Sequence, residues 1–377
     1  MTAASVYLDH AATTPLGPEA REAMEPYLSE RFGNASEPHA YGREARAALE
    51  GARRTIAELL DCEPAQVVFT SGGSEADNQA VFGFCGRPLG RLVVSAIEHP
   101  AVREPALELA RQGFEVEWVP VGGDGTVDAS AFAEAVKPGD RVAAVIWANN
   151  VTGVVQPVEE LAEVARASDV PFHCDAVQAA ASLPVSFARS GVDSVAISAH
   201  KLHGPKGVGC LVAREPGRLR PLVLGGGQER GHRSGTENIP GCVGFAAALA
   251  AARTTADHRL KMRTRLEAAL PDGVDVVCAA SDRLPGHSLL KVSGVRAELL
   301  VLALDREGYA VAAGSACSAG DAEPSHVLVA QGMSAEDARS VIRVSMGAGT
   351  TADEVDGLAA ALDRSIGTLR QGILPAA

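Results

Sequence analysis

Short apolar runs alternate with helical patterns between about residues 66 and 250. The runs are 66–70 (QVVFT), 91–97 (RLVVSAI), 141–147 (RVAAVIW), 170–174 (VPFHC), 193–198 (DSVAIS) and 207–213 (GVGCLVA), with helical stretches such as 101–112 and 158–167 between them. This alternation is typical of an α/β domain whose mostly parallel strands are joined by right-handed crossovers. Only a short glycine and proline segment separates the last two runs, so we expect these strands to be antiparallel neighbours in a mixed sheet.

The pattern changes after about residue 240. Helical periodicity covers 241–270, strand-like runs cover 274–280, 286–294 and 309–315, and a helical pattern over 353–369 closes the chain. This order predicts a second, smaller α+β domain. The length of 377 residues supports two domains, because it exceeds what one hydrophobic core usually holds.

Composition narrows the possible partners. The 34 basic residues are outnumbered by 47 acidic ones, and the formal net charge of −13 argues against a broad surface for nucleic acid or acidic membranes. The N-terminus has no charged segment followed by an apolar one, and no apolar run is long enough to span a bilayer. We therefore expect a cytoplasmic protein with small-molecule or protein partners.

Reactive side chains follow the apolar runs, where open α/β sheets bind their ligands. The glycine turn Ser71–Glu75 opens a helix whose free N–H groups suit a phosphate, although such a turn is also a common helix N-cap. The other runs are followed by His99, by Asn149 and Asn150, by Asp175 with Gln178 one helical turn later, and by His200 with Lys201. Taken singly, each of these residues has an ordinary structural explanation.

Together these strand ends provide what pyridoxal phosphate requires: a lysine for a Schiff base, an acid for the ring nitrogen, a phosphate loop and a flat group against the ring. Two lysines compete for the first role. Lys206 lies between Pro205 and Gly207 at the tip of a turn, so we expect its side chain to point to solvent or to the phosphate. Lys201 ends a strand beside Asp175 and is the better Schiff-base lysine.

One of the seven cysteines differs from the rest. Six of them lie in or next to apolar runs and are expected to be inert (62, 85, 174, 210, 242 and 278), and no spacing suggests a disulfide framework or a metal site. Cys317 instead lies in the small-residue stretch 312–326, AAGSACSAGDAEPSH. This stretch fits either tight packing or a mobile thiol, and a mobile thiol beside a pyridoxal pocket indicates nucleophilic sulfur chemistry.

The sequence closely resembles the cysteine desulfurases of the NifS/IscS type, in the class V aminotransferase group. The matching motifs are YLDHAATTP (7–15), GNASEPH (33–39), FTSGGSEADN (69–78), EHPAV (98–102), FHCDAVQ (172–178), SAHKLHGPKGVG (198–209), GGGQERGHRSGTEN (225–238), GSACSAG (314–320) and IRVS (342–345). The resemblance implies fold type I of the pyridoxal phosphate enzymes. A mostly parallel, seven-stranded mixed sheet would form a large domain over 14–255, and 1–13 with 256–377 would form a small domain carrying the Cys317 loop.

The resemblance also assigns roles. Lys201 would hold the cofactor, Asp175 would pair with its ring nitrogen, Gln178 would bond the ring hydroxyl, and His99 would stack on the ring and act as acid and base. The remaining assignments are Gly73, Ser74, Ser198 and His200 at the phosphate, Thr236 at the partner subunit's phosphate, and Asn150 with Arg343 at the substrate carboxylate. The Thr236 role implies a homodimer with shared active sites.

The implied reaction converts L-cysteine to L-alanine and leaves the sulfur on Cys317 as a persulfide, for transfer to an acceptor or scaffold protein, as in iron–sulfur cluster assembly. Its rivals are a selenocysteine lyase, another pyridoxal C–S lyase or aminotransferase in which Cys317 only packs, and a non-catalytic scaffold. The sequence departs from the family where Val151 replaces the usual glutamate and where Ser74 replaces the usual threonine of the phosphate loop. The serine keeps a hydroxyl, whereas Val151 removes a charge.

Overall fold

The computed structural model describes residues 6–86, 88–252, 255–314 and 324–372. Its main sheet has seven strands in the order β2-β8-β7-β6-β5-β3-β4. Their bounds are β2 Val67–Thr70, β3 Arg91–Ser95, β4 Glu115–Val119, β5 Val142–Ala144, β6 Phe172–Asp175, β7 Ser194–Ser198 and β8 Gly209–Ala213. All neighbours are parallel except β8, which is antiparallel to both β2 and β7. The predicted α/β fold with a mixed sheet is confirmed, including the antiparallel pair made by the short link.

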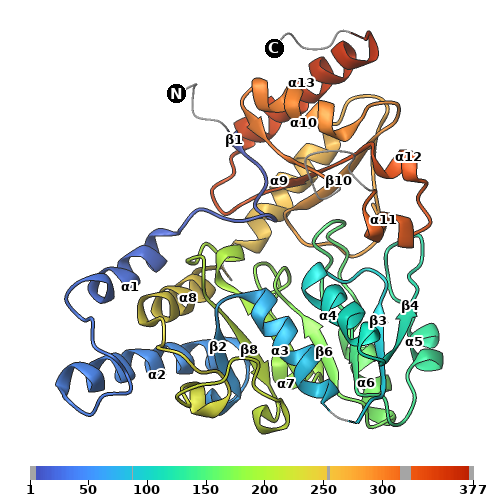
Figure 1. Cartoon of the computed structure of the whole chain (residues 1–377). Helices are drawn as coiled ribbons and strands as arrows, with labels where there is room; N and C mark the ends of the chain where they lie inside the picture. Colours follow the sequence, from blue (N-terminus) through green and yellow to red (C-terminus); the bar gives the residue numbers. More distant parts are fainter. Residues whose placement is uncertain (1–5, 87, 253–254, 315–323, 373–377) are drawn as a thin grey trace.

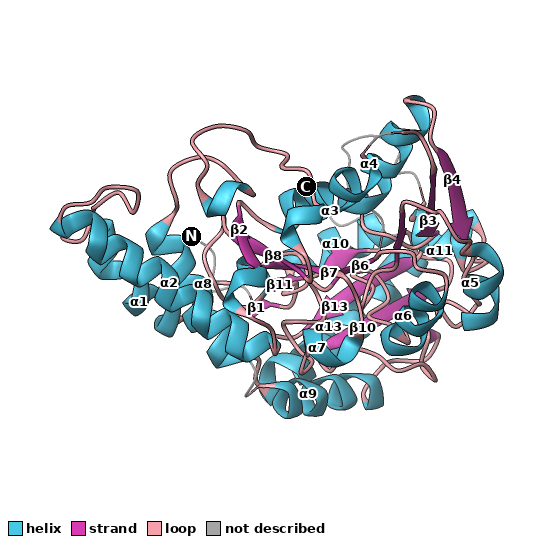
Figure 2. Cartoon of the chain, turned by 90° about the horizontal axis from the view of Figure 1, so that it is seen from below, coloured by secondary structure: helices cyan, strands magenta, loops and turns pink. Residues whose placement is uncertain are grey.

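Helices cover both faces of this sheet, which explains why its central strands are continuous apolar runs. Figure 2 shows α3 (Gly73–Cys85) and α4 (Pro100–Arg111) on one face, and α5 (Ala129–Ala135), α6 (Val158–Ala167) and α7 (Phe187–Ser190) on the other. Apolar side chains of α3 and α4 pack on Leu92, Val94 and Val142 of the sheet. Beyond β2 and β8, α8 (Ile239–Ala252) lies beside α1 (Pro18–Leu28) and α2 (Ala40–Leu60) (Figure 1).

A second sheet has its own hydrophobic core. Its order is β12-β13-β10-β9, with bounds β9 Val274–Val276, β10 His287–Val292, β12 Ala312–Ala313 and β13 Val341–Ser345. The helices here are α9 (Ala256–Ala268), α10 (Ala297–Arg306), α11 (His326–Ala330), α12 (Ala335–Ala338) and α13 (Ala352–Arg370). The core joins Leu8 from the N-terminal segment to residues between Leu266 and Ile366. The proposed domain boundary after residue 255 stays a prediction.

The N-terminal segment ties the two sheets together. β1 (Val6–Tyr7) pairs in parallel with β11 (Tyr309–Ala310), Asp9 then forms a bridge to Ser345 of β13, and the Thr14 N–H donates to the His200 carbonyl just after β7. We call the second sheet with its helices the second unit. The described residues nearest the two termini both belong to this second unit (Figure 1). Short 3-10 turns occur at Pro64–Gln66, Ala199–Lys201, Pro216–Arg218 and Glu229–Gly231.

Two elements differ from the sequence expectation. The edge strand β4 had no counterpart among the apolar runs, because its residues alternate between charged and apolar and are only half-buried. The expected strand over 309–315 is split between β11 and β12, which belong to different sheets. Among the described helices, none alone is long and apolar enough to cross a membrane, although the bent pair α8 and α9 meets the length and composition together.

Candidate active site

One edge of the main sheet collects the predicted site residues. β2, β3, β5, β6 and β7 all point in one direction, so their carboxyl ends meet at that edge. Gly73 starts α3 after β2, Lys201 follows β7, Asp175 ends β6, and His99 is the N-cap of α4 after β3. Asn150 lies in the turn after β5.

A cavity of about 220 Å³ opens at this edge. Nine of the predicted residues line it: Gly73, Ser74, His99, Asn150, Asp175, Gln178, Ser198, His200 and Lys201. Three other residues that sequence reasoning did not single out complete its wall: Asp77, Ile146 and Val177. The structure therefore brings together in one cavity the strand-end residues that are far apart in sequence.

The Lys201 amine lies at the wall formed by the N-terminal segment. Its Nζ donates hydrogen bonds to the carbonyl oxygens of Ala11, at 2.5 Å, and Ala12, at 2.7 Å. Burial and the nearby positive charge of Arg343 lower the pKa of Lys201 to about 8, against the opposing pull of Asp175 and Asp9. About a tenth of this amine is therefore neutral, and nucleophilic, at pH 7, far more than for an ordinary lysine.

His99 and Asp175 face the same cavity. The Nδ1 atom of His99 accepts a hydrogen bond from the backbone N–H of Ala101 at 3.0 Å, so a neutral ring carries its proton on Nε2. Burial lowers the pKa of His99, which favours that neutral form, although Asp175 opposes the shift. The Asp175 carboxyl is only 4% exposed, accepts from the Val177 N–H at 2.9 Å, and has its pKa raised by burial. It therefore lacks a full countercharge.

A second opening of about 380 Å³ adjoins the first at the start of α3. Ser71, Gly73, Ser74, Ser198 and His200 line it, as do Thr13 and Lys206. Gly73 is required by close packing, because an added Cβ would lie 2.6 Å from Cγ2 of Val177. Free N–H groups of a helix start and the Lys206 amine make this opening suitable for an anion, while burial lowers the pKa of His200 to about 4 and keeps that ring neutral. Lys206 thus lines the anion opening and not the cavity of Lys201.

Arg343 does not line the cavity of about 220 Å³, but it contacts the backbone of Asn150, which does. Its Nη1 donates to the Asn150 carbonyl oxygen at 2.9 Å, and its Nη2 forms an ion pair with Asp9 at 2.7 Å. The Nε atom is buried without a hydrogen-bond partner in the described part of the chain. Nearby Val151 packs with Ile97, Ile146 and Val327, so its apolar side chain suits its surroundings.

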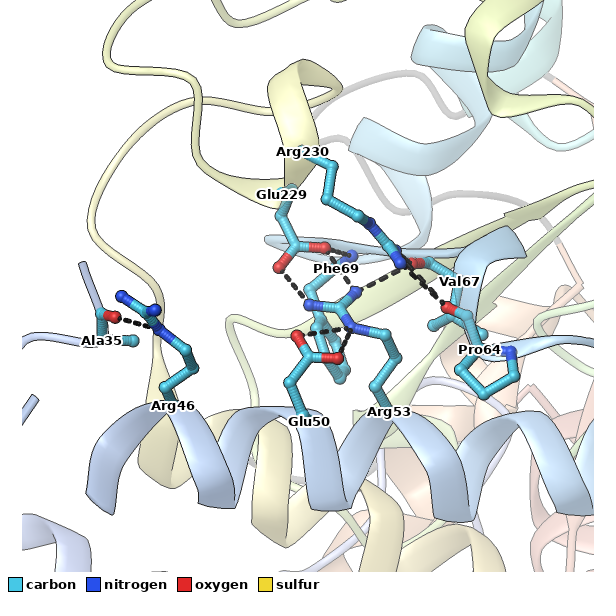
Figure 3. Close-up of polar contacts among 9 residues, drawn as sticks. All are labelled: Ala35, Arg46, Glu50, Arg53, Pro64, Val67, Phe69, Glu229 and Arg230. Atoms are coloured by element: carbon cyan, nitrogen blue, oxygen red, sulfur yellow. Dashed lines mark hydrogen bonds and ion pairs between the residues drawn. The ribbon is translucent and has the colours of Figure 1, made fainter. Parts of the chain in front are cut away.

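Thr236 is exposed and lies outside both openings, on the segment 225–238. Figure 3 shows how that segment is held: the buried Arg53 of α2 forms two 2.7 Å hydrogen bonds with Glu229. Glu229 also accepts from the backbone N–H of Phe69 in β2. Further along, Arg233 forms an ion pair with Glu75 in the first turn of α3, at 2.9 Å. The segment is thus fixed to the elements that form the anion opening.

Cys317 lies outside the described residues. The other six cysteines are reduced; Cys85, Cys174, Cys210 and Cys242 are buried, whereas Cys62 and Cys278 are partly buried. Burial raises the pKa of each of these six thiols, which agrees with the prediction that they are inert.

Sequence reasoning missed a group of buried polar residues beneath the cavity. Asp77 and His173 form a contact of 3.1 Å, and His173 also bonds the Ser194 hydroxyl at 2.9 Å. The fully buried Glu98 accepts from Ser95 and from the backbone N–H of Ile146. Polar residues inside apolar runs, such as His173, were the available signal. The hydrogen bond that the Ala11 carbonyl accepts from Lys201 could not be predicted from side-chain types, because this oxygen is a backbone atom.

Comparison with known proteins agrees with this geometry. Residues 6–358 match the family model described as aminotransferase class-V. The chain belongs to this family. A cysteine desulfurase from Cereibacter sphaeroides is 43% identical, with 97% of this chain and 96% of that protein aligned. The IscS-like cysteine desulfurase of Mycobacterium tuberculosis is 40% identical, with 98% of both chains aligned.

Solved structures give the same result. A NifS-like protein superposes with a TM-score of 0.89 at 32% identity, covering 97% of this chain and all of the other. The structure described as SspA in complex with cysteine has a TM-score of 0.82 at 31% identity, covering 90% of this chain and 98% of the other. The resemblance to cysteine desulfurases is therefore confirmed, and this member of the class-V aminotransferase family is an enzyme of that kind. These matches favour a desulfurase over the selenocysteine lyase alternative.

Proposed function

We propose that the protein uses pyridoxal 5'-phosphate to convert L-cysteine to L-alanine and to transfer the sulfur to Cys317 as a persulfide. The observation that carries this proposal is the convergence of Lys201, Asp175 and His99 on one cavity in a member of the cysteine desulfurase group. The related structure described with bound cysteine supports the choice of substrate.

The residues present fit the cofactor. Asp175 is a carboxyl whose pKa is raised by burial, and a protonated ring nitrogen would supply a positive charge that stabilises its ionised form. The opening at the start of α3 offers N–H groups, hydroxyls and Lys206 to a phosphate. Lys201 lies between these two sites with an amine of lowered pKa. Gln178 lines the same cavity and would reach the ring hydroxyl.

Each of these side chains has its own role in the proposed mechanism. When bound, the cofactor supplies an electron sink that stabilises the charge left at the substrate Cα after proton removal. Arg343 and the Asn150 side chain would hold the substrate carboxylate, for which the guanidinium fork is suited. The neutral Lys201 amine would take the α-proton, and His99, with its proton on Nε2, would donate and accept protons during the later steps.

The sulfur step balances without an external oxidant. The Cys317 thiolate attacks the substrate sulfur, a sulfur–sulfur bond forms, and the carbon–sulfur bond breaks. The electron pair of that bond stays with the carbon fragment, which takes up protons and leaves as alanine. One cysteine and one thiol thus become one alanine and one persulfide, whose outer sulfur passes to an acceptor or scaffold protein in the cytoplasm, as in iron–sulfur cluster assembly.

The decisive experiment compares the parent protein with Cys317→Ala. Alanine and sulfide are measured with L-cysteine as substrate, and selenocysteine serves as the comparison substrate. We expect the variant to lose most cysteine turnover while it keeps the absorption band of the bound cofactor. Unchanged cysteine turnover in Cys317→Ala would rule out the persulfide mechanism and favour a lyase in which this thiol only packs.

A second experiment tests the choice of lysine. We expect Lys201→Ala to lose the absorption band of the covalently held cofactor, whereas Lys206→Ala keeps the band and binds the cofactor more weakly. The reverse pattern would assign the Schiff base to Lys206.

A further inference from the structure

A second cavity is larger than the one that the predicted cofactor residues line. Its volume is about 640 Å³, and it lies between the start of α1, the ends of α8 and α9 that face each other, and the start of α13. Figure 1 shows these elements where the two units meet. Lys201 borders this cavity and the cofactor cavity alike. The assigned chemistry leaves this larger space without an occupant.

A buried arginine lines this second cavity without a partner for its charge. Arg259 of α9 is only 9% exposed, and its single side-chain hydrogen bond runs from Nη2 to the carbonyl oxygen of Ala181. Its Nε atom has no hydrogen-bond partner, and no carboxylate pairs with the guanidinium among the residues that the structure describes. Burial alone lowers the pKa of Arg259, to about 10, so the group stays charged at neutral pH.

The other arginines buried to this degree are paired. Arg53 bonds Glu229, and Arg283 bonds Glu267 through two nitrogen–oxygen contacts of 2.8 and 3.1 Å. An unpaired buried charge is costly, which is why buried arginines usually have a carboxylate partner. Among the described residues, Arg259 therefore lacks the carboxylate partner that the other two buried arginines have.

The rest of the lining indicates the kind of anion. His10 and His203 line the cavity beside Arg259, and the Nδ1 atom of His10 is also buried without a partner in the described part of the chain. Glu19 and Glu354 line it as well, and neither forms an ion pair with Arg259. These two acids disfavour any anion, and they disfavour a phosphate or a dicarboxylate more than a single carboxylate, because the repulsion grows with the charge of the ligand. A single carboxylate would meet one guanidinium and neutral imidazoles.

We propose that this second cavity is a binding site for a small molecule with one carboxylate, held by the guanidinium of Arg259. The planar fork of arginine is suited to a carboxylate, and a largely preformed pocket with few polar groups is the usual form of such sites. The site shares the Lys201 wall with the cofactor cavity, but binding at Arg259 does not depend on turnover of cysteine.

Acetate is the probe for the test. We compare the Tm of the full-length, cofactor-loaded protein in sodium acetate and in sodium chloride of equal ionic strength. Acetate should raise the Tm by roughly 1–3 °C when it is well above its Kd. Arg259→Met should abolish this rise, and it should cost little stability in chloride, because it removes an uncompensated charge. Arg259→Lys, which keeps the charge, should retain part of the rise.

Two control variants make the result decisive. Arg283→Met should lose stability in both salts, because the partly buried Glu267 then keeps only Arg263 at 4.0 Å and the Ser288 hydroxyl as partners, and it should keep the acetate effect. Arg343→Met removes any acetate bound at the proposed substrate-carboxylate site, and it should keep the part of the rise that depends on Arg259. The proposal is overturned if acetate has no effect on the parent protein and Arg259→Met is as damaging as Arg283→Met, which would reveal a partner within the chain. It also fails if Arg343→Met, and not Arg259→Met, removes the rise.

Discussion

Glu98 shows how strongly the interior beneath the active site disfavours charge. The carboxyl is fully buried, and its Oε1 accepts hydrogen bonds from Ser95 and from the Ile146 N–H, at 2.5 and 2.6 Å. Its Oε2 has no partner among the described residues. Burial, together with the negative charge of Asp175, raises the pKa of Glu98 to about 8. The folded protein therefore keeps this carboxyl neutral at pH values where an unfolded chain has ionised it.

The raised pKa of Glu98 predicts a pH-dependent stability difference. Between an unfolded pKa of about 4.3 and the folded pKa, a rise in pH favours unfolding by up to about 1.4 kcal/mol per pH unit. Glu98→Gln cannot titrate, so its free energy of unfolding relative to the parent should rise from pH 5 to pH 8 and then level off. Urea unfolding at several pH values measures this difference. A difference independent of pH would mean that the carboxyl is ionised in the folded protein.

Lys201 gives a second prediction at this scale. Because its pKa is lowered to about 8, the rate at which protein stripped of cofactor captures pyridoxal phosphate should rise with pH up to about 8 and then level off. Arg343→Met removes a positive charge that helps to lower this pKa, so the midpoint of the rate profile should move to higher pH. Arg364→Met, at an exposed arginine of α13, is the control and should leave the midpoint in place. An unshifted midpoint in Arg343→Met would contradict the electrostatic coupling.

At the scale of the element, the sequence predicted the strands and helices that depend on a local pattern of apolar and polar residues. The apolar runs became the strands β2, β3, β5, β6, β7 and β8, and the 158–167 pattern became α6 with those bounds. The sequence also predicted that Lys201 and Asp175 lie close together, because the carboxyl ends of parallel strands meet at one edge of the sheet. The Ala11 carbonyl at Lys201 and the lack of a carboxylate beside Arg259 among the described residues depend on how distant segments meet, and neither leaves a periodic signal. The edge strand β4 was missed because its half-exposed face is charged.

The segment 225–238 depends on one such distant contact. Glu229 and Arg230 have φ angles of 49° and 58°, a conformation that costs energy for residues other than glycine. The buried ion pair of Arg53 with Glu229 holds the segment in this shape (Figure 3). The pair therefore joins α2, β2 and the segment that carries Thr236.

Breaking this pair should be costly. Arg53→Met leaves Glu229 buried and unpaired, so we expect a loss of about 3–5 kcal/mol in the free energy of unfolding. Arg265→Met is the matched control, because the Arg265–Asp356 ion pair is about half exposed and such pairs contribute only about 0–1 kcal/mol. Urea unfolding of both variants tests the comparison. Equal losses in the free energy of unfolding would show that burial does not make the Arg53–Glu229 pair more important for stability than an exposed pair.

At the scale of the whole molecule, one subunit supplies the cofactor cavity but leaves Thr236 outside it. Thr236 is exposed, and the segment that carries it is fixed to β2 and α3 of its own subunit. The proposed homodimer gives this residue a function, because a rigid segment can then reach the phosphate of the partner subunit. Each active site would contain Lys201 from one subunit and Thr236 from the other.

Mixing two defective variants tests this arrangement. Thr236→Ala should weaken cofactor retention, and Lys201→Ala should abolish activity. In a mixed dimer, the subunit with Thr236→Ala supplies an intact Lys201, and its partner supplies an intact Thr236, so one of the two sites is complete. Refolding the two variants together should therefore restore cysteine turnover and cofactor retention at that site, whereas each variant refolded alone should not recover. A mixture no better than the average of its components, or a monomer by sedimentation at assay concentration, would contradict shared sites.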